Sequence, residues 1–385
     1  MGAVVVIVGI AAMIVIHEGA HFAAAKAFNL KATEAFFGFG PTLLKTTRGE
    51  TTYGVKAFPL GGYVRIIGMN PFEEIEDGDE ERTYRAAPFW KKSIVVLAGV
   101  VSHLVVAFFL FALVALGWGV LAEDEQGSPI PTTTVGRVAG TLPDGTPTPA
   151  ALSGIQAGDT IVSFDGEPID TWDEFGDAAD AHPNQEVVIG VVRSDEAIDF
   201  TATLAEVQKP VLVAGEPLED EEGNPVTRSA GFFGVTPRAA TESVGVIGAL
   251  TDAAESLWFA VTQSFRGLWE MVVNFPRVVL AAFGGNDEVL ETARPISPIG
   301  LVQISGPVES SLTLLAYVNV FVAVLNVVPL YPLDGGHFAV ALYEKVTGRA
   351  PDVRKLMPVA VAVFAFVVAL GLLGIYFDIV KPLQL

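Results

Sequence analysis

Four long apolar segments constrain the fold more than any other feature of the sequence. They cover residues 1–28, 94–121, 312–330 and 357–379. A helix needs about 20 mostly apolar residues to cross a bilayer, and each segment approaches or exceeds that length. With 51% of its 385 residues hydrophobic, the chain is more apolar than an average soluble protein. The sequence therefore predicts a polytopic α-helical membrane protein with four transmembrane helices.

The first apolar segment has an alternative interpretation as a secretory signal peptide. Against it, no basic residues precede the run Ala3–Ile16, and a polar stretch at 17–21 interrupts the segment. Apolar residues resume at Phe22. A transmembrane helix is therefore favoured over a cleaved leader.

Lys and Arg are distributed unevenly along the chain. Ten lie within residues 26–92, four within 345–355, and eight within the much longer stretch 122–311. The positive-inside rule assigns the Lys- and Arg-rich loops to the cytoplasm. We therefore expect a multi-pass protein of the cytoplasmic (inner) membrane, with the long loop and both termini extracytoplasmic.

Charge and cysteine content restrict the partners and the metal chemistry. The formal net charge is -21, with acids concentrated in 73–81 and 144–255. Nucleic acid is not an expected partner, because phosphate recognition needs clustered Lys and Arg. The chain has no cysteine, so a metal would be held by His and carboxylate side chains.

Two loops carry strand patterns. Within residues 29–93, strand-like segments at 51–58 and 63–67 with Gly-rich breaks predict a membrane-associated β-hairpin region. Within residues 135–207, the patterns predict a small extracytoplasmic α+β domain. Its expected elements are three strands and one helix, at 160–164, 186–193, 197–203 and 171–181.

Residues 208–311 follow that domain in the long loop, and we expect an amphipathic helical region there. The segment 242–283 mixes aromatic residues with scattered charges and reads as an interrupted helix. Such a composition favours a helix on the membrane surface, and an ordinary packed helix is the alternative. No role is evident for the acidic insertion 210–229.

The sharpest chemical signal is the H-E-x-x-H sequence at 17–21. Two histidines four residues apart, His17 and His21, lie on one face of a helix and reach one zinc ion. Glu18 between them is placed to activate a water as a general base. A purely structural polar cluster is the alternative, but such residues are costly in a transmembrane helix unless they hold something.

A catalytic zinc takes three protein ligands and leaves one position open. No further histidine follows the motif at a suitable spacing, so the third ligand comes from elsewhere. Asp334 is the candidate, because prolines and glycines in 326–337 break the helix and return the backbone toward the bilayer interior. On chemistry alone, His337 is a rival.

These motifs, H-E-x-x-H at 17–21 and N-x-x-P-x-x-P-L-D-G-G-H at 326–337, resemble those of the site-2 protease family of intramembrane zinc metalloproteases. The resemblance is nearest to the bacterial RseP-like branch, covers essentially the whole chain and includes a PDZ-like core at 153–166. It implies that residues 135–207 form a single PDZ domain, which binds extended peptides. It also implies a set of roles: zinc ligands His17, His21 and Asp334, general base Glu18, and substrate-binding residues Asn326, Gly38, Phe39 and Gly40.

One departure from the family pattern lies in the second span. The family commonly has G-P-x-x-N there, whereas this chain has Gly99-Val100-Val101-Ser102-His103. His103 is an accessory candidate that would hydrogen-bond a developing oxyanion or order the site. A satisfied interior histidine is the equal alternative.

The implied function is cleavage of single-span membrane proteins within the bilayer, in regulated intramembrane proteolysis. Anti-sigma factors and remnant signal peptides are the implied substrates, and Zn²⁺ the cofactor. Two other classes stay open: a membrane metal transporter and a catalytically inactive membrane PDZ scaffold. No inverted repeat supports the transporter, and the intact ligand set speaks against the scaffold.

Overall fold

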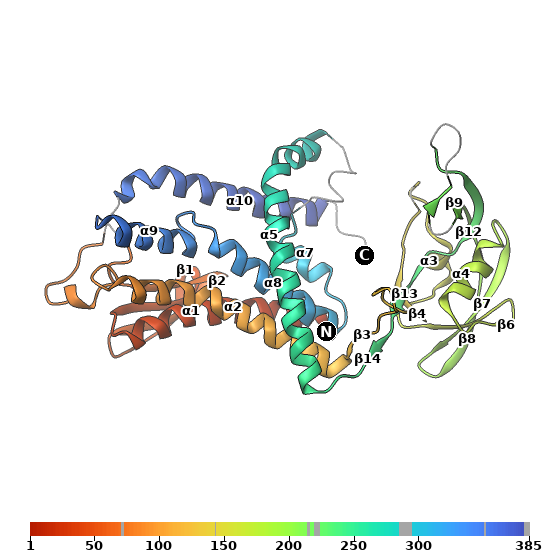
Figure 1. The fold of residues 1–385 in the computed structure, drawn as a ribbon, viewed down its shortest axis with the longest axis horizontal. Helices are drawn as coiled ribbons and strands as arrows, with labels where there is room; N and C mark the ends of the chain where they lie inside the picture. The colour runs from red at the N-terminus through yellow and green to blue at the C-terminus, as the bar shows by residue number, and fades with distance from the viewer. Residues whose placement is uncertain are drawn as a thin grey trace. The chain divides into compact units, whose positions relative to one another are not determined.

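The computed structural model describes residues 1–70, 73–142, 144–213, 216–218, 224–284, 295–349 and 352–380. The chain divides into two compact units (Figure 1). Unit 1 comprises Met1–Trp118 and Val244–Leu383, and unit 2 comprises Gly119–Ser243. The acidic insertion at 210–229 lies partly outside the described residues.

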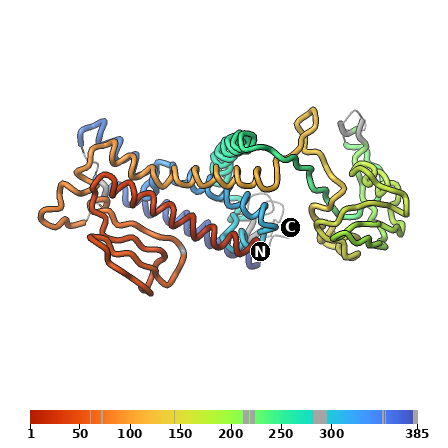
Figure 2. Tube along the Cα trace, turned by 90° about the horizontal axis from the view of Figure 1, so that it is seen from below, coloured from red at the N-terminus to blue at the C-terminus, as the bar shows by residue number. Residues whose placement is uncertain are grey.

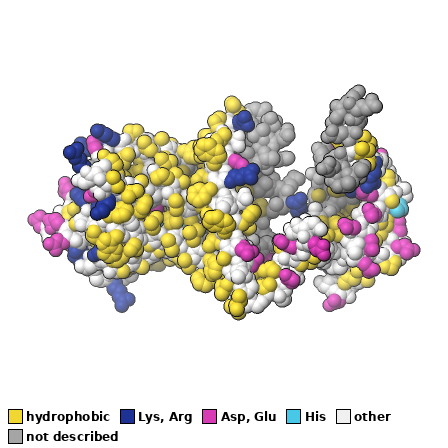
Figure 3. Space-filling view, viewed as in Figure 1, with side chains coloured by type: hydrophobic (Ala, Val, Ile, Leu, Met, Phe, Trp, Pro, Cys, Tyr) yellow, Lys and Arg dark blue, Asp and Glu magenta, His cyan; other side chains and the backbone are white. Residues whose placement is uncertain are grey.

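Unit 1 contains four helices that are long and apolar enough to cross a membrane, as the sequence predicts. They are α1 Gly2–Ala27, α2 Phe89–Trp118, α8 Val308–Val327 and α10 Met357–Val380. Figures 1 and 2 show them running lengthwise through the unit, and Figure 3 shows hydrophobic side chains over much of its visible surface. The chain is therefore a multi-pass membrane protein in its architecture.

Helix α2 begins five residues before the predicted span of 94–121 and ends three residues before the end of that span. Its start includes Lys92, which a sequence reading places in the preceding loop. The Lys92 ammonium is buried and donates a 2.7 Å hydrogen bond to Glu344 Oε2 on α9, Asp334–Thr347. Because this pairing neutralises the charge, the helix extends through the lysine and fastens α9 to α2.

A β-sheet in unit 1 lies beside α1 and consists of β1 Ala32–Arg48 and β2 Thr51–Ile66. The central segment 34–37 pairs with 62–65 on one side and with 52–55 on the other. Residues 42–48 then pair with 51–56. The two strands thus form four sheet segments, with 62–65 along one edge.

Strand β1 bends between its segments 34–37 and 42–48, and two glycines allow this bend. Gly38 and Gly40 have φ angles of +86° and +84°, a region that residues with a Cβ rarely adopt. A Cβ added at Gly38 would stand 2.7 Å from the Phe58 carbonyl oxygen. The Gly-rich break that the sequence predicts is therefore a bend within one strand.

The long helix α5, Val246–Gly284, is continuous and contains Pro276, so the expected interruption is wrong. It crosses the direction of the spanning helices, as Figures 1 and 2 show, and packs against α2 and α8. The small side chains Ala253 and Ala260 are buried in that contact, whereas Trp258 and Trp269 are 71% and 70% exposed. One face is therefore packed while another presents large aromatics.

A short helix, α7 Pro298–Gln303, is joined to the end of α10. The Asp378 carboxylate is fully buried and accepts hydrogen bonds from the backbone N–H groups of Ser297, at 2.9 Å, and Gly300, at 3.0 Å. A carboxylate at a helix N-terminus satisfies donors that otherwise lack partners. Among its described residues, the unit also has the short 3₁₀ turns η1 Glu80–Arg82 and η2 Val353–Lys355.

Unit 2 is built on a sheet with strand order β13-β4-β5-β7-β8, with β6 beside β5. Strands β5 and β7 fall where the sequence predicts them, and helix α4 begins with a capping box formed by Thr171 and Glu174. Buried aliphatic and aromatic side chains, including Ile161, Ile189 and Phe175, fill its core. The elements are β4 Pro131–Val138, α3 Pro149–Ser153, β5 Thr160–Phe164, β6 Glu167–Pro168, α4 Trp172–Asp180, β7 Glu186–Arg193, β8 Glu196–Thr203 and β13 Val235–Ala239.

A partly buried ion pair holds the residue before β5 to the end of β7. The Arg193 guanidinium donates to both carboxylate oxygens of Asp159, at 2.6 and 2.7 Å. This guanidinium holds the pKa of Asp159 below its usual range. Asp159 therefore stays charged in the Ala-Gly-Asp turn that the sequence analysis singled out.

The expected helical region at 208–311 is wrong before Val246, because the described residues there form strands and connecting turns. Prolines at 210, 217, 225 and 237 break any helix there. Strand β13 joins the main sheet, so the folded unit exceeds the predicted range 135–207. The other strands are β3 Val120–Leu121, β9 Ala205–Pro210, β10 Leu212–Val213, β11 Glu216–Pro217, β12 Thr227–Phe232 and β14 Thr241–Glu242.

Candidate metal centre

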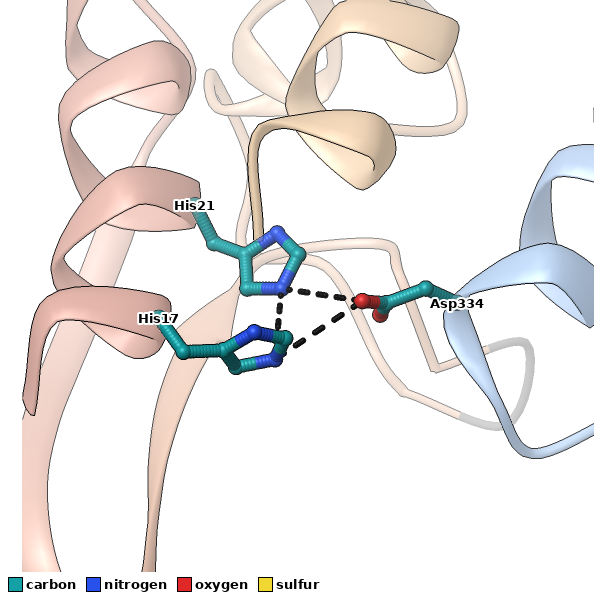
Figure 4. Close-up of side chains that lie close together, drawn as sticks. All are labelled: His17, His21 and Asp334. Carbon is teal, nitrogen blue, oxygen red and sulfur yellow. Dashed lines mark hydrogen bonds and ion pairs between the residues drawn. The ribbon is translucent and has the colours of Figure 1, made fainter. Parts of the chain in front are cut away.

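Three side chains from two helices converge inside unit 1 (Figure 4). His17 and His21 project from one face of α1, as their spacing predicts, and their Nε2 atoms lie 3.2 Å apart. Asp334 at the start of α9 approaches both. Its Oδ2 lies 3.4 Å from His21 Nε2 and 3.7 Å from His17 Nε2.

Two glycines bring Asp334 to the histidines. A Cβ added at Gly335 would stand 2.1 Å from the Val327 carbonyl oxygen, and one at Gly336 would stand 2.4 Å from the Tyr331 backbone nitrogen. The chain after α8 therefore folds back so closely that only glycine fits at these two positions. The two glycines of the D-G-G sequence are therefore needed for this close approach of the chain.

The donor set and its spacing fit a zinc ion. Zn–N and Zn–O bonds of about 2.0–2.2 Å in a tetrahedron place neighbouring ligand atoms roughly 3.4 Å apart. The three observed separations, 3.2, 3.4 and 3.7 Å, cluster around that value. Asp334 Oδ2 is buried and has no hydrogen-bond partner among the described residues, as expected for an atom reserved for a metal.

Helix α2 supports the cluster from the side. His21 Nδ1 donates a 2.8 Å hydrogen bond to the Val95 carbonyl oxygen, which leaves Nε2 as the lone-pair donor. Gly99 lies directly against the rings. A Cβ added there would stand 2.3 Å from His21 Nε2 and 2.6 Å from His17 Cε1.

Glu18 lies beside the cluster but outside the ligand group. It lines an apolar cavity of about 540 Å³ between α1 and the β1–β2 sheet, together with Phe22 and Phe36. A Cβ on Gly62 would stand 3.1 Å from Glu18 Cγ, so the edge segment of the sheet begins beside this carboxyl group. The arrangement offers a proton acceptor next to three metal-ligating atoms.

A second groove of about 990 Å³ runs along residues 63–66 at the edge of the sheet and is also lined by the first turns of α10. Tyr331 and His337 line it, with their ring centroids 4.7 Å apart. Burial lowers the pKa of His337 to about 4, so this ring is neutral at physiological pH. It is not part of the three-residue ligand group.

The other sequence-predicted residues are dispersed. Asn326 is half-buried near the end of α8, and its side chain bonds to no other described residue. Gly38, Phe39 and Gly40 form the bend of β1, where Phe39 is 47% exposed. His103 is buried next to His17, with ring centroids 4.7 Å apart.

The sequence analysis assigned no role to Val95, Gly99 and Gly62, nor to Asn319, whose amide oxygen lies 3.0 Å from His103 Nδ1. The sequence contained two signals for these residues. Gly99 begins the segment that stands where the family has G-P-x-x-N, and Asn319 is a polar residue within an apolar span. Val95 contributes a backbone carbonyl, which no side-chain pattern can reveal.

Comparison with known proteins agrees with this geometry. Residues 5–370 match the model of peptidase family M50. The chain is 32% identical to the zinc metalloprotease Rip1 of Mycobacterium tuberculosis (strain H37Rv) and 31% identical to Rip1 of Mycolicibacterium smegmatis, with 100% of this chain and 98% of each relative covered. It is 23% identical to a putative zinc metalloprotease of Clostridium acetobutylicum, over 99% of this chain and 98% of that protein.

Among the functions that the sequence left open, the protease is favoured over the metal transporter and the inactive scaffold. The motifs, the four membrane-type helices and these similarities all point to it. The chain belongs to peptidase family M50, the site-2 protease family, and is an intramembrane zinc metalloprotease.

Proposed function

We propose that His17, His21 and Asp334 hold the zinc of this protease and that Glu18 is its general base. The observation that carries the proposal is the convergence of three metal-ligating atoms at 3.2–3.7 Å, with Glu18 beside them but outside the ligand group. Three protein ligands leave one coordination position open, which is the arrangement of a catalytic zinc.

A zinc ion held by His17, His21 and Asp334 would supply Lewis-acid chemistry at the scissile carbonyl and at a water molecule. Glu18 takes a proton from the attacking water and transfers it to the leaving amide nitrogen. His21 keeps its orientation through its hydrogen bond to the Val95 carbonyl oxygen. The cavity beside Glu18 is lined mainly by apolar side chains.

The substrate must be unwound before it is cut, because a helix hides its carbonyl groups in internal hydrogen bonds. We assign the receiving edge to residues 62–66: Gly62 lies beside Glu18, and residues 63–66 line the groove that reaches Tyr331 and His337. Adding a strand there satisfies the amides that unwinding frees, and these are costly to leave unpaired in a membrane. Asn326 would hold the substrate backbone near the cut.

The substrates in this proposal are membrane proteins with one transmembrane helix, such as anti-sigma factors or remnant signal peptides. Membrane proteomes of cells producing wild type and Glu18→Gln test it. We expect single-span fragments to accumulate in the variant. A variant proteome that differs only in multi-span or soluble proteins would reject this substrate class.

We also propose that unit 2 and both termini are extracytoplasmic, in the cytoplasmic membrane. The Lys and Arg distribution supports this orientation, and Figure 3 shows such side chains gathered at the end of unit 1 that carries the α1–α2 connection. The α1–α2 and α9–α10 connections would then face the cytoplasm.

Single cysteines test the orientation without background, because the chain has none. Thr47 and Ser194 are both exposed, so each tolerates the change. We expect Ser194→Cys to react with an impermeant maleimide in intact cells, and Thr47→Cys to react only after permeabilisation. The opposite pattern would place unit 2 in the cytoplasm.

We further propose that unit 2 is a PDZ-like domain that filters substrates and takes no part in the chemistry. The proposed catalytic residues all lie in unit 1, whereas unit 2 has its own core. Such a domain would admit proteins whose outer segment is already trimmed and exclude intact ones.

The structure provides a clean deletion for this test. Leu121 of β3 pairs with Thr241 of β14, so residues 122–240 can be replaced by a short flexible linker. We expect the shortened enzyme to cleave a pre-trimmed substrate at nearly the wild-type rate and also to cleave the untrimmed form. Loss of both activities in a folded, zinc-loaded variant would instead indicate that the domain delivers substrate.

A further inference from the structure

Glu74 is an acidic residue in the groove along the sheet edge. The groove is lined on one side by residues 63–66 and elsewhere by Tyr331, His337 and the first turns of α10. Glu74 belongs to the same lining and is exposed. In the part of the chain that the structure describes, its carboxylate has no hydrogen-bond or ion-pair partner. This carboxylate is therefore available to a molecule that enters the groove.

The other two charged side chains that line the groove, Arg65 and Glu73, are already paired. The Arg65 guanidinium donates hydrogen bonds to Glu73, at 2.8 Å, and to Glu34, at 3.2 Å. The second carboxylate oxygen of Glu73 accepts a 2.8 Å hydrogen bond from the Gly68 backbone N–H, and the Glu73 side chain is 6% exposed. Arg65 is thus matched by two carboxylates. The charge of Glu74 is the one that remains uncompensated among these groove residues.

The course of the groove indicates which part of a substrate would reach Glu74. In the function proposed above, a substrate strand adds to residues 62–66, and Gly62 lies beside Glu18, where the bond is cut. From residue 63 the groove follows the edge to Glu74, which lies in the α1–α2 connection. In the proposed orientation this connection is cytoplasmic. The segment that lies in the groove would then be the cytoplasmic flank of the substrate helix.

We propose that Glu74 is a specificity-determining residue, which pairs with a Lys or Arg in the cytoplasmic flank of the substrate. Membrane proteins carry an excess of these residues on that side, so the charge of Glu74 complements the flank of a single-span protein. Met357, Val361 and Phe364 of α10 line the same groove and would contact the apolar residues of the substrate. The inference rests on the receiving edge and the orientation proposed above. It adds a basic flank to the description of the substrate class.

Cleavage of two model substrates by the purified full-length protein tests the proposal. The substrates have the same apolar helix and differ only in the cytoplasmic flank, which carries a Lys-Lys or a Gln-Gln pair. We expect kcat/KM to be about 2–5-fold higher for the Lys-Lys substrate, the effect of one partly exposed ion pair. The difference should shrink as the salt concentration rises. Glu74→Gln should abolish the difference while cleaving the Gln-Gln substrate as fast as wild type does.

Asp77→Asn is the matched control, because Asp77 is exposed in the same segment but does not line the groove. It removes the same charge and should keep the wild-type preference. Glu74→Lys should instead favour a substrate with a Glu-Glu flank. Equal cleavage of the Lys-Lys and Gln-Gln substrates by wild type, or an equal loss of preference in Asp77→Asn, would overturn the inference. Wild-type cleavage rates in Glu18→Gln would refute the proposed function itself, which separates the two failures.

Discussion

Glu18→Gln is expected to abolish cleavage while leaving zinc fully bound. Glu18 lies next to the ligand group without belonging to it, so its loss removes a proton acceptor and no coordinating atom. Removing a general base costs on the order of 10²–10⁴-fold in rate. Zinc content by metal analysis and cleavage of a reconstituted single-span substrate are the two measurements.

The ligand variants should behave differently from the base variant. We expect His21→Ala and Asp334→Ala to lose both zinc and cleavage, because each leaves two protein ligands. Glu125→Gln, at an exposed glutamate of unit 2, is the matched control and should change neither. Stoichiometric zinc in Asp334→Ala would move the third ligand elsewhere, with His337 the next candidate.

The candidate ligands were accessible from sequence because their placement is largely local. A separation of four positions between His17 and His21 is enough to put both on one helix face. The prolines and glycines around Asp334 predict a break in the helix, and the structure shows why glycine is needed at positions 335 and 336. The four apolar spans followed from length and hydrophobicity, and all four were found.

The parts that sequence reasoning could not supply depend on contacts between distant elements. Residues 34–37 pair on both sides with β2, which requires knowledge of how β2 turns back between residues 55 and 62. The burial of Lys92 depends on Glu344 in a helix far along the chain. The same holds for His103 and Asn319, whose hydrogen bond joins α2 to α8.

The second large effect is expected at Gly99, a residue that carries no chemistry. An alanine methyl at this position would stand 2.3 Å from His21 Nε2 and 2.6 Å from His17 Cε1. The atoms that must move are therefore those of the ligand rings. Alanine is favoured over glycine in a helix interior by about 1 kcal/mol, so α2 itself is not weakened. A folded protein with a displaced ligand set is the expected product.

We therefore expect the cleavage rate of Gly99→Ala to fall by about 10²-fold or more, because a shift of about 1 Å in a catalytic geometry can lower the rate that much. Its zinc affinity should fall as well. Gly117→Ala is the matched control, because it lies in the same helix and a Cβ there meets nothing within 4 Å. We expect Gly117→Ala to bind zinc and cleave as wild type does, with both variants equally helical by circular dichroism. Normal zinc affinity in Gly99→Ala would show that the rings have room to retreat, and that the close approach of α2 is not what holds the ligands in place.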